Sequence, residues 1–272
     1  MFEIERQVEN ATNTANDAGW WERVVPVTES LARRVGGMTG ADIEQLVRQA
    51  RRKARREKRQ LSYADLSNLL DSVRPPLSDE ASFRIAHHEA GHVVVGLHLE
   101  PRMMIRQVVL NDRDGNGLVA GSHPQDELLT EERMMARITT CLAGRAAERL
   151  FCGNASAHSG CGKQSDLAQA TKLAYLLEMA SGLGCQHPLV YREVEDLFAL
   201  LANNTPLVEM INARLSVNEK EAWTLVVRHQ KAIEYLAGCL FVWGTLDGSR
   251  LDEVLAEVIN IMKAREDLDV GF

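Results

Sequence analysis

The stretch His87-His88-Glu89-Ala90-Gly91-His92 decides the fold and carries the strongest chemical signal in the chain. It contains the pattern HExxH, formed by His88, Glu89 and His92. Two histidines four residues apart on a helix project from one face, about 6 Å apart at their Cβ atoms, so both rings can reach one metal ion. The glutamate between them can hold and deprotonate a metal-bound water. The pattern predicts a metal site. The alternative is that the three polar side chains form ordinary hydrogen bonds inside a helical core.

Length and composition indicate an ordinary globular protein. The chain has 272 residues, of which 45% are hydrophobic and 25% charged, so one or two domains with a sizeable core are expected. A net charge of −7 gives no general reason to expect nucleic-acid binding. No apolar run approaches the roughly 20 residues that span a bilayer, and the start, MFEIERQVEN, has no signal-peptide core. Five cysteines without CxxC pairing fit reduced thiols in a cytosolic setting.

The HExxH pattern lies within a helix predicted over residues 78–99. Ser78 supplies an N-terminal cap, two acidic residues follow in the first turn, and Pro101 ends the helix. Both histidines belong to a stripe that recurs every three or four residues: Ala81, Ile85, His88, His92, Val95 and Leu99. Both are therefore expected to face inward.

The chain beyond this helix is predicted to be mainly helical, with one small β element. Two strands are expected over 104–110 and 118–122. The connection at 111–117 has acidic residues in the order of a calcium loop, but His123 falls where the closing acidic ligand belongs, so a hairpin turn is favoured. An exposed strand here could pair with an extended peptide. Helices are expected over 130–151, with Thr130 as its N-terminal cap, from 165 onward, and over 190–202, 216–243 and 249–265.

Residues 1–75 are predicted to form a separate small helical unit that ends at Pro75-Pro76. Its helices are expected over 28–35, 40–59 and 63–73. Eight basic residues fall within 48–59. Because the chain is net acidic and no aromatic residues are interleaved with them, a solvated face or a contact between subunits is favoured over nucleic-acid binding.

The segment Gly37–Ile43, followed by the basic helix, resembles the helical lid of AAA-type ATPases. Only the later part of such a lid is present. No strand followed by GxxxxGK[ST] occurs in these 272 residues, and the similar Gly160–Lys163 lacks both the first glycine and the Ser or Thr. ATP is therefore expected only in the context of a longer protein.

A catalytic zinc needs a third protein ligand beyond the two histidines. The extended pattern HExxHxxGxxH is excluded, because Val95 stands where that pattern has its glycine. His98 is expected to be a surface or packing residue. The residue spacing alone leaves the third ligand open.

Three motifs in order resemble the peptidase domain of the FtsH-type ATP-dependent zinc metalloproteases: HHEAGH from residue 87, LAGRAAERLF from 142 and SDLAQAT from 165. The resemblance implies that His88, His92 and Asp166 bind zinc and that Glu89 is the general base. The spacing leaves a helix-cap role open for Asp166. The implied fold is mainly α (α+β), a helical zincin-type domain at 76–272 with a small sheet, preceded by a partial AAA lid at 1–75.

The resemblance also implies endoproteolysis of unfolded or extended polypeptides, ATP-driven delivery, a ring of six subunits, a place on the cytoplasmic side and a membrane anchor in the full-length protein. The alternative is a catalytically silent oligomerisation or scaffold module, against which the four intact residues argue.

This chain departs from the family pattern in several places. Residues 161–165 replace the usual Thr-Gly-Ala, which leaves a ligand role for Cys161 open. His87 is expected to support or pack, and the segment 185–204 matches nothing recognisable. Residues 245–248 resemble a turn near the family's end.

Overall fold

The computed structural model describes residues 31, 35, 38–73, 77–110, 117–124, 128–157, 160–184, 189, 191–192 and 197–270. Most of the helix predicted over 28–35, most of the calcium-like connection at 111–117 and nearly half of the unmatched segment at 185–204 lie outside these residues. The statements below concern the described residues.

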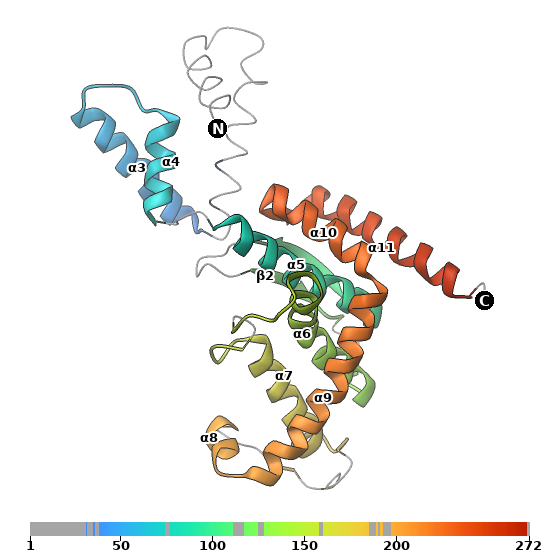
Figure 1. The fold of residues 1–272 in the computed structure, drawn as a ribbon. Coiled ribbons are helices and arrows are strands. Elements are labelled where there is room, and N and C mark those ends of the chain that lie inside the picture. The colour runs from blue at the N-terminus through green and yellow to red at the C-terminus, as the bar shows by residue number, and fades with distance from the viewer. Residues whose placement is uncertain are drawn as a thin grey trace.

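Two long helices, α5 (Asp79–Leu99) and α6 (Glu131–Cys152), form the centre of the molecule (Figure 1). The predicted caps are confirmed: the Ser78 hydroxyl accepts a hydrogen bond from Ala81 N, and the Thr130 hydroxyl accepts one from Arg133 N. These bonds satisfy amide groups that a helix start leaves without intrahelical partners. The HExxH pattern thus lies in the middle of a well-capped helix.

Small residues let α5 and α6 approach each other closely. A Cβ at Gly91 would lie 2.8 Å from both Ala143 O and Ala147 Cβ, so only glycine fits there. Val93 and Val94 are fully buried, as are Ala143 and Ala147. The helix that carries the histidines is therefore fixed against α6 by backbone-to-backbone contact.

The later helices wrap around this pair. They are α7 (Asp166–Tyr175), which continues into a π-helical segment at Leu176–Ala180, α8 (Leu197–Ala202), α9 (Thr205–Arg228), α10 (Gln230–Trp243) and α11 (Gly248–Val270). Figure 1 shows α9 running along α6 and α7, with α10 lying above α5 and α11 packed on α10.

The helical segment predicted over 216–243 is divided between two helices, of which the first begins earlier, at Thr205. The chain breaks at His229, which ends α9 and begins α10. Its side chain is buried, and its Nε2 lies 3.1 Å from His98 Nδ1 at the end of α5. This contact is long-range, so the local pattern could not reveal the break. His98 is a packing residue, as expected.

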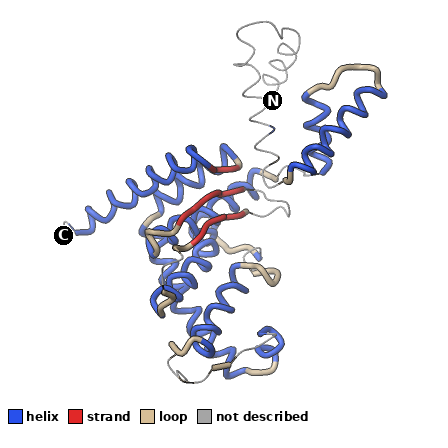
Figure 2. Tube along the Cα trace, turned by 180° about the vertical axis from the view of Figure 1, so that it is seen from behind, coloured by secondary structure: helices blue, strands red, loops and turns tan. Residues whose placement is uncertain are grey.

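A three-stranded antiparallel sheet covers one side of α5 (Figure 2). The two predicted strands are β1 (Met104–Val109) and β2 (Leu118–Ser122). The expected turn at 245–248 is instead a strand, β3 (Thr245–Asp247), which pairs with β1. A three-residue strand has too short a pattern to recognise without its partner. The strand order β2-β1-β3 leaves β2 at an edge.

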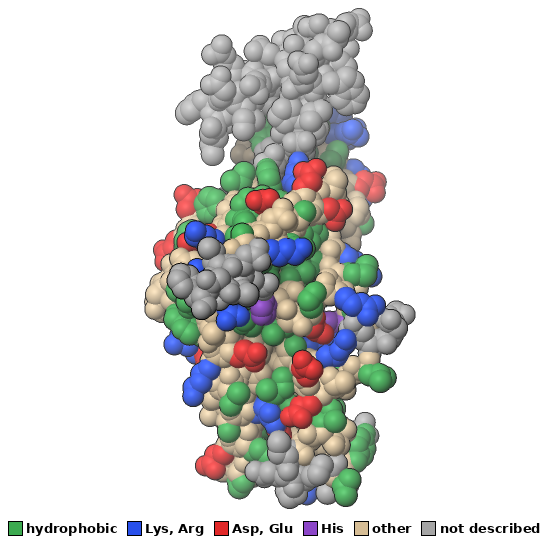
Figure 3. Space-filling view, turned by 90° about the vertical axis from the view of Figure 1, so that its right-hand side faces the viewer, with side chains coloured by type: hydrophobic (Ala, Val, Ile, Leu, Met, Phe, Trp, Pro, Cys, Tyr) green, Lys and Arg blue, Asp and Glu red, His purple; other side chains and the backbone are tan. Residues whose placement is uncertain are grey.

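The helices α3 (Gly40–Arg56) and α4 (Tyr63–Val73) form a hairpin that stands apart from α5–α11 in Figure 1. The predicted end of α3 at residue 59 is too late, because Glu57 caps the helix and Lys58 has a positive φ of 54°. The mainly helical fold with a small sheet is confirmed. None of the described helices is both long and apolar enough to span a membrane. Acidic and basic side chains are interspersed over the face in Figure 3.

Candidate metal centre

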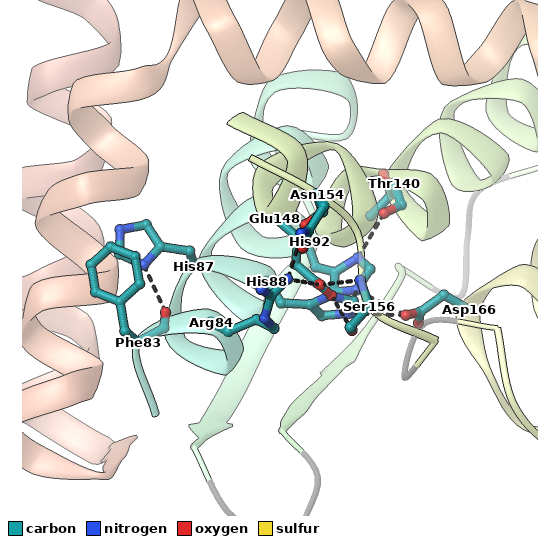
Figure 4. A network of polar contacts seen from close by, with 10 residues as sticks. All are labelled: Phe83, Arg84, His87, His88, His92, Thr140, Glu148, Asn154, Ser156 and Asp166. Atoms are coloured by element: carbon teal, nitrogen blue, oxygen red, sulfur yellow. Dashed lines mark hydrogen bonds and ion pairs between the residues drawn. The ribbon is translucent and has the colours of Figure 1, made fainter. Parts of the chain in front are cut away.

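Three side chains from two distant parts of the chain meet at one point (Figure 4). His88 Nε2 lies 3.0 Å from Asp166 Oδ2 and 3.0 Å from His92 Nε2, and His92 Nε2 lies 3.4 Å from Asp166 Oδ2. Within the described part of the chain, these three side chains form a group that could hold a metal ion, because their ligand atoms all lie within 4.8 Å of one another. Two imidazoles and one carboxylate are a donor set that suits a catalytic zinc.

The second ring nitrogen of each histidine, Nδ1, faces away from this point and makes a hydrogen bond of its own. His88 Nδ1 lies 2.8 Å from Glu148 Oε1, and His92 Nδ1 lies 2.7 Å from the Thr140 carbonyl oxygen. Both partners are acceptors, so the network places a proton on Nδ1 of each ring and turns Nε2 toward the common point. Such outer contacts orient metal-binding histidines.

Gly144 on α6 forms the floor beneath the two rings. A Cβ at this position would lie 2.5 Å from Nε2 of both His88 and His92. The rings cannot move away easily, because both are largely buried and held through Nδ1. A glycine is therefore required where α6 passes the point at which the ligand atoms meet.

Asp166 reaches the site from the first turn of α7. The cap of this helix is Ser165, whose hydroxyl accepts a hydrogen bond from Ala168 N, so the helix-cap role considered for Asp166 is wrong. About a third of the Asp166 side chain is exposed, which makes it the most accessible of the three candidate ligands.

The electrostatics of the site favour positive charge at the ring nitrogens. Burial alone would lower the pKa of His88, but the hydrogen bonds to Asp166 and Glu148 raise it to about 10. Burial would raise the pKa of Glu148, yet bonds from His88, Ser156 and Arg84 lower it to about 2. A metal ion would compete with a proton for the same nitrogen atoms.

Glu89 faces a cleft of about 920 Å³ that also contains the three candidate ligands. Its carboxylate lies against Gly117, where a Cβ would overlap it. The edge strand β2 lines the same cleft through Leu118, Val119 and Gly121. An extended chain paired with β2 would therefore run past Glu89.

The remaining predicted site residues lie elsewhere. His87 packs between Phe83 and Phe151, with ring centroids 4.1 and 4.4 Å away, and its Nδ1 lies 2.8 Å from Phe83 O. It is a packing residue, as expected. Cys161 lines the cleft but is exposed and outside the converging group, so a cysteine ligand has no support.

Glu148 is the functional residue that the sequence left without a role. Its side chain is almost fully buried and bonds the first histidine. The available signal was its place at the end of LAGRAAE, four residues after Gly144, so that one face of α6 carries both.

A HExxH helix whose ring nitrogens meet a carboxylate in a cleft beside an edge strand is the arrangement of a metallopeptidase domain. The family model described as peptidase family M41 matches residues 76–254. The chain belongs to this family, that of the FtsH-type zinc metalloproteases.

Individual relatives agree with this assignment. The chain is 32% identical over 250 residues to ATP-dependent zinc metalloprotease FtsH 1 of Sorangium cellulosum, covering 83% of this chain and 39% of the relative. It is 27% identical over 254 residues to ATP-dependent zinc metalloprotease FtsH of Chloroflexus aggregans, covering 85% and 38%. The corresponding protein of Mycoplasma genitalium is 27% identical over 242 residues, covering 82% and 34%. The chain thus spans about two fifths of the length of the relatives it matches.

Proposed function

We propose that this chain is a zinc-dependent endopeptidase in which His88, His92 and Asp166 bind the metal and Glu89 is the general base. The observation that carries the proposal is the convergence of two Nε2 atoms and one carboxylate oxygen in the cleft that Glu89 faces. A non-catalytic scaffold has no physical need for this convergence, nor for a glycine that clears space for it.

The proposed chemistry divides the work among these side chains. A zinc ion at this site would lower the pKa of a bound water toward about 7 and polarise the peptide carbonyl. Glu89 accepts the proton that the attacking water loses and returns it to the leaving amine. Glu148 and Thr140 O keep both rings turned toward the centre.

The proposed substrate is an unfolded or extended polypeptide. The edge position of β2 and its place along the cleft support pairing of such a chain with the sheet. The relatives are named ATP-dependent, which supports ATP-driven delivery by a longer protein. A ring of six subunits, a place on the cytoplasmic side, a membrane anchor and the division into 1–75 and 76–272 stay predictions; the family match from residue 76 supports the division.

The test combines metal content with cleavage of casein by the wild type, Glu89→Gln and Asp166→Ala. We expect the wild type to hold one zinc and cleave casein. Glu89→Gln should retain zinc and lose about 10²–10⁴-fold in cleavage, because only proton transfer is removed. Asp166→Ala should lose zinc. A wild type that holds zinc but cleaves no faster than Glu89→Gln would instead favour the scaffold alternative.

A further inference from the structure

Arg84 connects the helix of the histidines to the loop that leads to the third candidate ligand. It lies on α5, one turn before His88, and its side chain is mostly buried. Its Nη1 donates to Glu148 Oε2 at 3.0 Å and to the carbonyl oxygen of Asn154 at 2.9 Å (Figure 4). One guanidinium group thus binds both the carboxylate behind His88 and the backbone that follows α6.

Ser156 makes a second connection between the same two parts. Its backbone N–H donates to Glu148 Oε2 at 2.6 Å, and its hydroxyl donates to Glu148 Oε1 at 3.0 Å. Oε1 of Glu148 is therefore shared between His88 and the loop, and Oε2 is shared between Arg84 and the loop. Because Glu148 is buried and charged, these short bonds are of the strong, charge-assisted kind.

The anchored loop leads directly to Asp166. After Ser156, the carbonyl oxygen of Ala157 accepts hydrogen bonds from Gly160 N and Cys161 N, and Ser165 then caps α7. Asp166 is the first residue of that helix, ten positions after Ser156. The start of the loop and the ring of His88 consequently share one set of bonds.

We propose that Arg84 is a positioning residue of the metal centre. Through its bonds to Glu148 and to the Asn154 carbonyl oxygen, it fixes the His88 ring and the loop that leads to Asp166 in position relative to each other. The inference rests on the proposed function, since it concerns how firmly a zinc ion is held. Loss of Arg84 removes one partner of Glu148 and frees the loop at Asn154, so both sides of the ligand set become less fixed.

The test compares Arg84→Ala and Arg84→Lys with Arg145→Ala in the full chain. Arg145 is a matched control, because it also forms a long-range ion pair, with Glu219 at 3.1 Å, but is not bonded to the loop. Zinc release into an excess of a colorimetric chelator is followed over time, which requires no catalysis. The thermal midpoint of each metal-free variant reports on the fold alone.

Arg84→Ala should release zinc about 10–100-fold faster than the wild type, with partial rescue in Arg84→Lys. Arg145→Ala should stay within about twofold, as expected of a partly exposed pair. If Arg84→Ala does not fold, Ser156→Ala, which removes only the hydroxyl bond, should still speed release severalfold.

Wild-type release rates in both Arg84→Ala and Ser156→Ala would overturn the positioning role and leave the proposed function intact. Equal acceleration in Arg84→Ala and Arg145→Ala would also overturn it, since the effect would then reflect general stability. A wild type that binds no zinc would overturn the proposed function itself.

Discussion

The metal centre and the α3–α4 hairpin are both built around a buried carboxylate, but they are held by contacts of very different range. Asp65 in the hairpin accepts hydrogen bonds from Arg59 and Ser62, which are six and three residues away. Glu148 in the centre bonds His88, 60 residues away, and His88 in turn meets Asp166, 78 residues away.

Because of this difference in range, the two regions should respond differently to a substitution. A change in the hairpin should be felt locally, because its bonds close within a few residues. A change at the centre should be felt by all ligands at once, because α5, α6 and α7 must pack together before Asp166 meets the two histidines. The predictions below test that contrast, from the largest expected effect to the smallest.

Gly144→Ala should have the largest effect. The added methyl group would lie 2.5 Å from Nε2 of both histidines, where the metal must bind. We expect zinc affinity to fall about 100-fold or more, comparable to the upper end of disruptions around a metal site. The metal-free fold should lose some stability as well, because the rings that meet the methyl group are buried and held through Nδ1; overpacking costs about 1–3 kcal/mol, against about 1 kcal/mol gained in helix propensity. Isothermal titration with zinc and urea unfolding measure the two quantities separately.

Gly238→Ala on α10 is the matched control, because nothing lies within 4 Å of the added Cβ. It should keep the zinc affinity of the wild type and gain the same helical propensity. If Gly144→Ala binds zinc as tightly as Gly238→Ala does, the close approach of α6 to the rings does not govern the centre.

Gly91→Ala should have the next largest effect, on stability. Its Cβ would meet the carbonyl oxygen of Ala143 and the Cβ of Ala147 at 2.8 Å, so α5 and α6 must separate. Overpacking of this kind costs about 1–3 kcal/mol, against about 1 kcal/mol gained in helix propensity. Urea unfolding of the metal-free protein should show net destabilisation relative to Gly238→Ala, and equal midpoints for the two variants would contradict it.

The same difference in range explains how far the sequence could be interpreted. Helix caps at Ser78 and Thr130 and the hairpin helices depend on neighbours a few residues away, and these predictions are confirmed. The sheet was predicted only in part, because β3 becomes a strand through pairing with β1, which lies more than 130 residues earlier. The break at His229 likewise lies at a contact with a distant residue, His98.

The residues of the site likewise fall into those that a local pattern predicts and those that only long-range packing brings together. His88, Glu89 and His92 follow from one helical turn, whereas Asp166 entered only through resemblance to a family. Arg84 had no signal of its own and Glu148 only its place four residues after Gly144, because a carboxylate and a guanidinium on separate helices look like surface charges until the helices are packed. The packing of α5 against α6, and of α6 against α7, brings these residues together.

Asp65→Asn should have the smallest and most local effect. Arg59 and Ser62 would lose a charged acceptor, so amide hydrogens of α4 should exchange about tenfold faster, as expected when about 1.4 kcal/mol of hydrogen bonding is lost. Exchange in α5 and α6 should stay at the wild-type rate, and zinc affinity should not change. Faster exchange throughout α5–α7 would contradict the separation of the two regions.

The pH dependence of that effect identifies its cause. The hydrogen bond from Arg59, opposed by burial and assisted by Ser62, holds the pKa of Asp65 well below its usual range. A carboxyl whose folded pKa is depressed stabilises fully above its unfolded pKa of about 3.9 and loses that contribution as the pH falls toward the folded value. The wild type should therefore exchange more slowly than Asp65→Asn at pH 6, with the difference shrinking below about pH 4. A difference that persists unchanged down to pH 2 would show that shape, rather than charge, holds the hairpin.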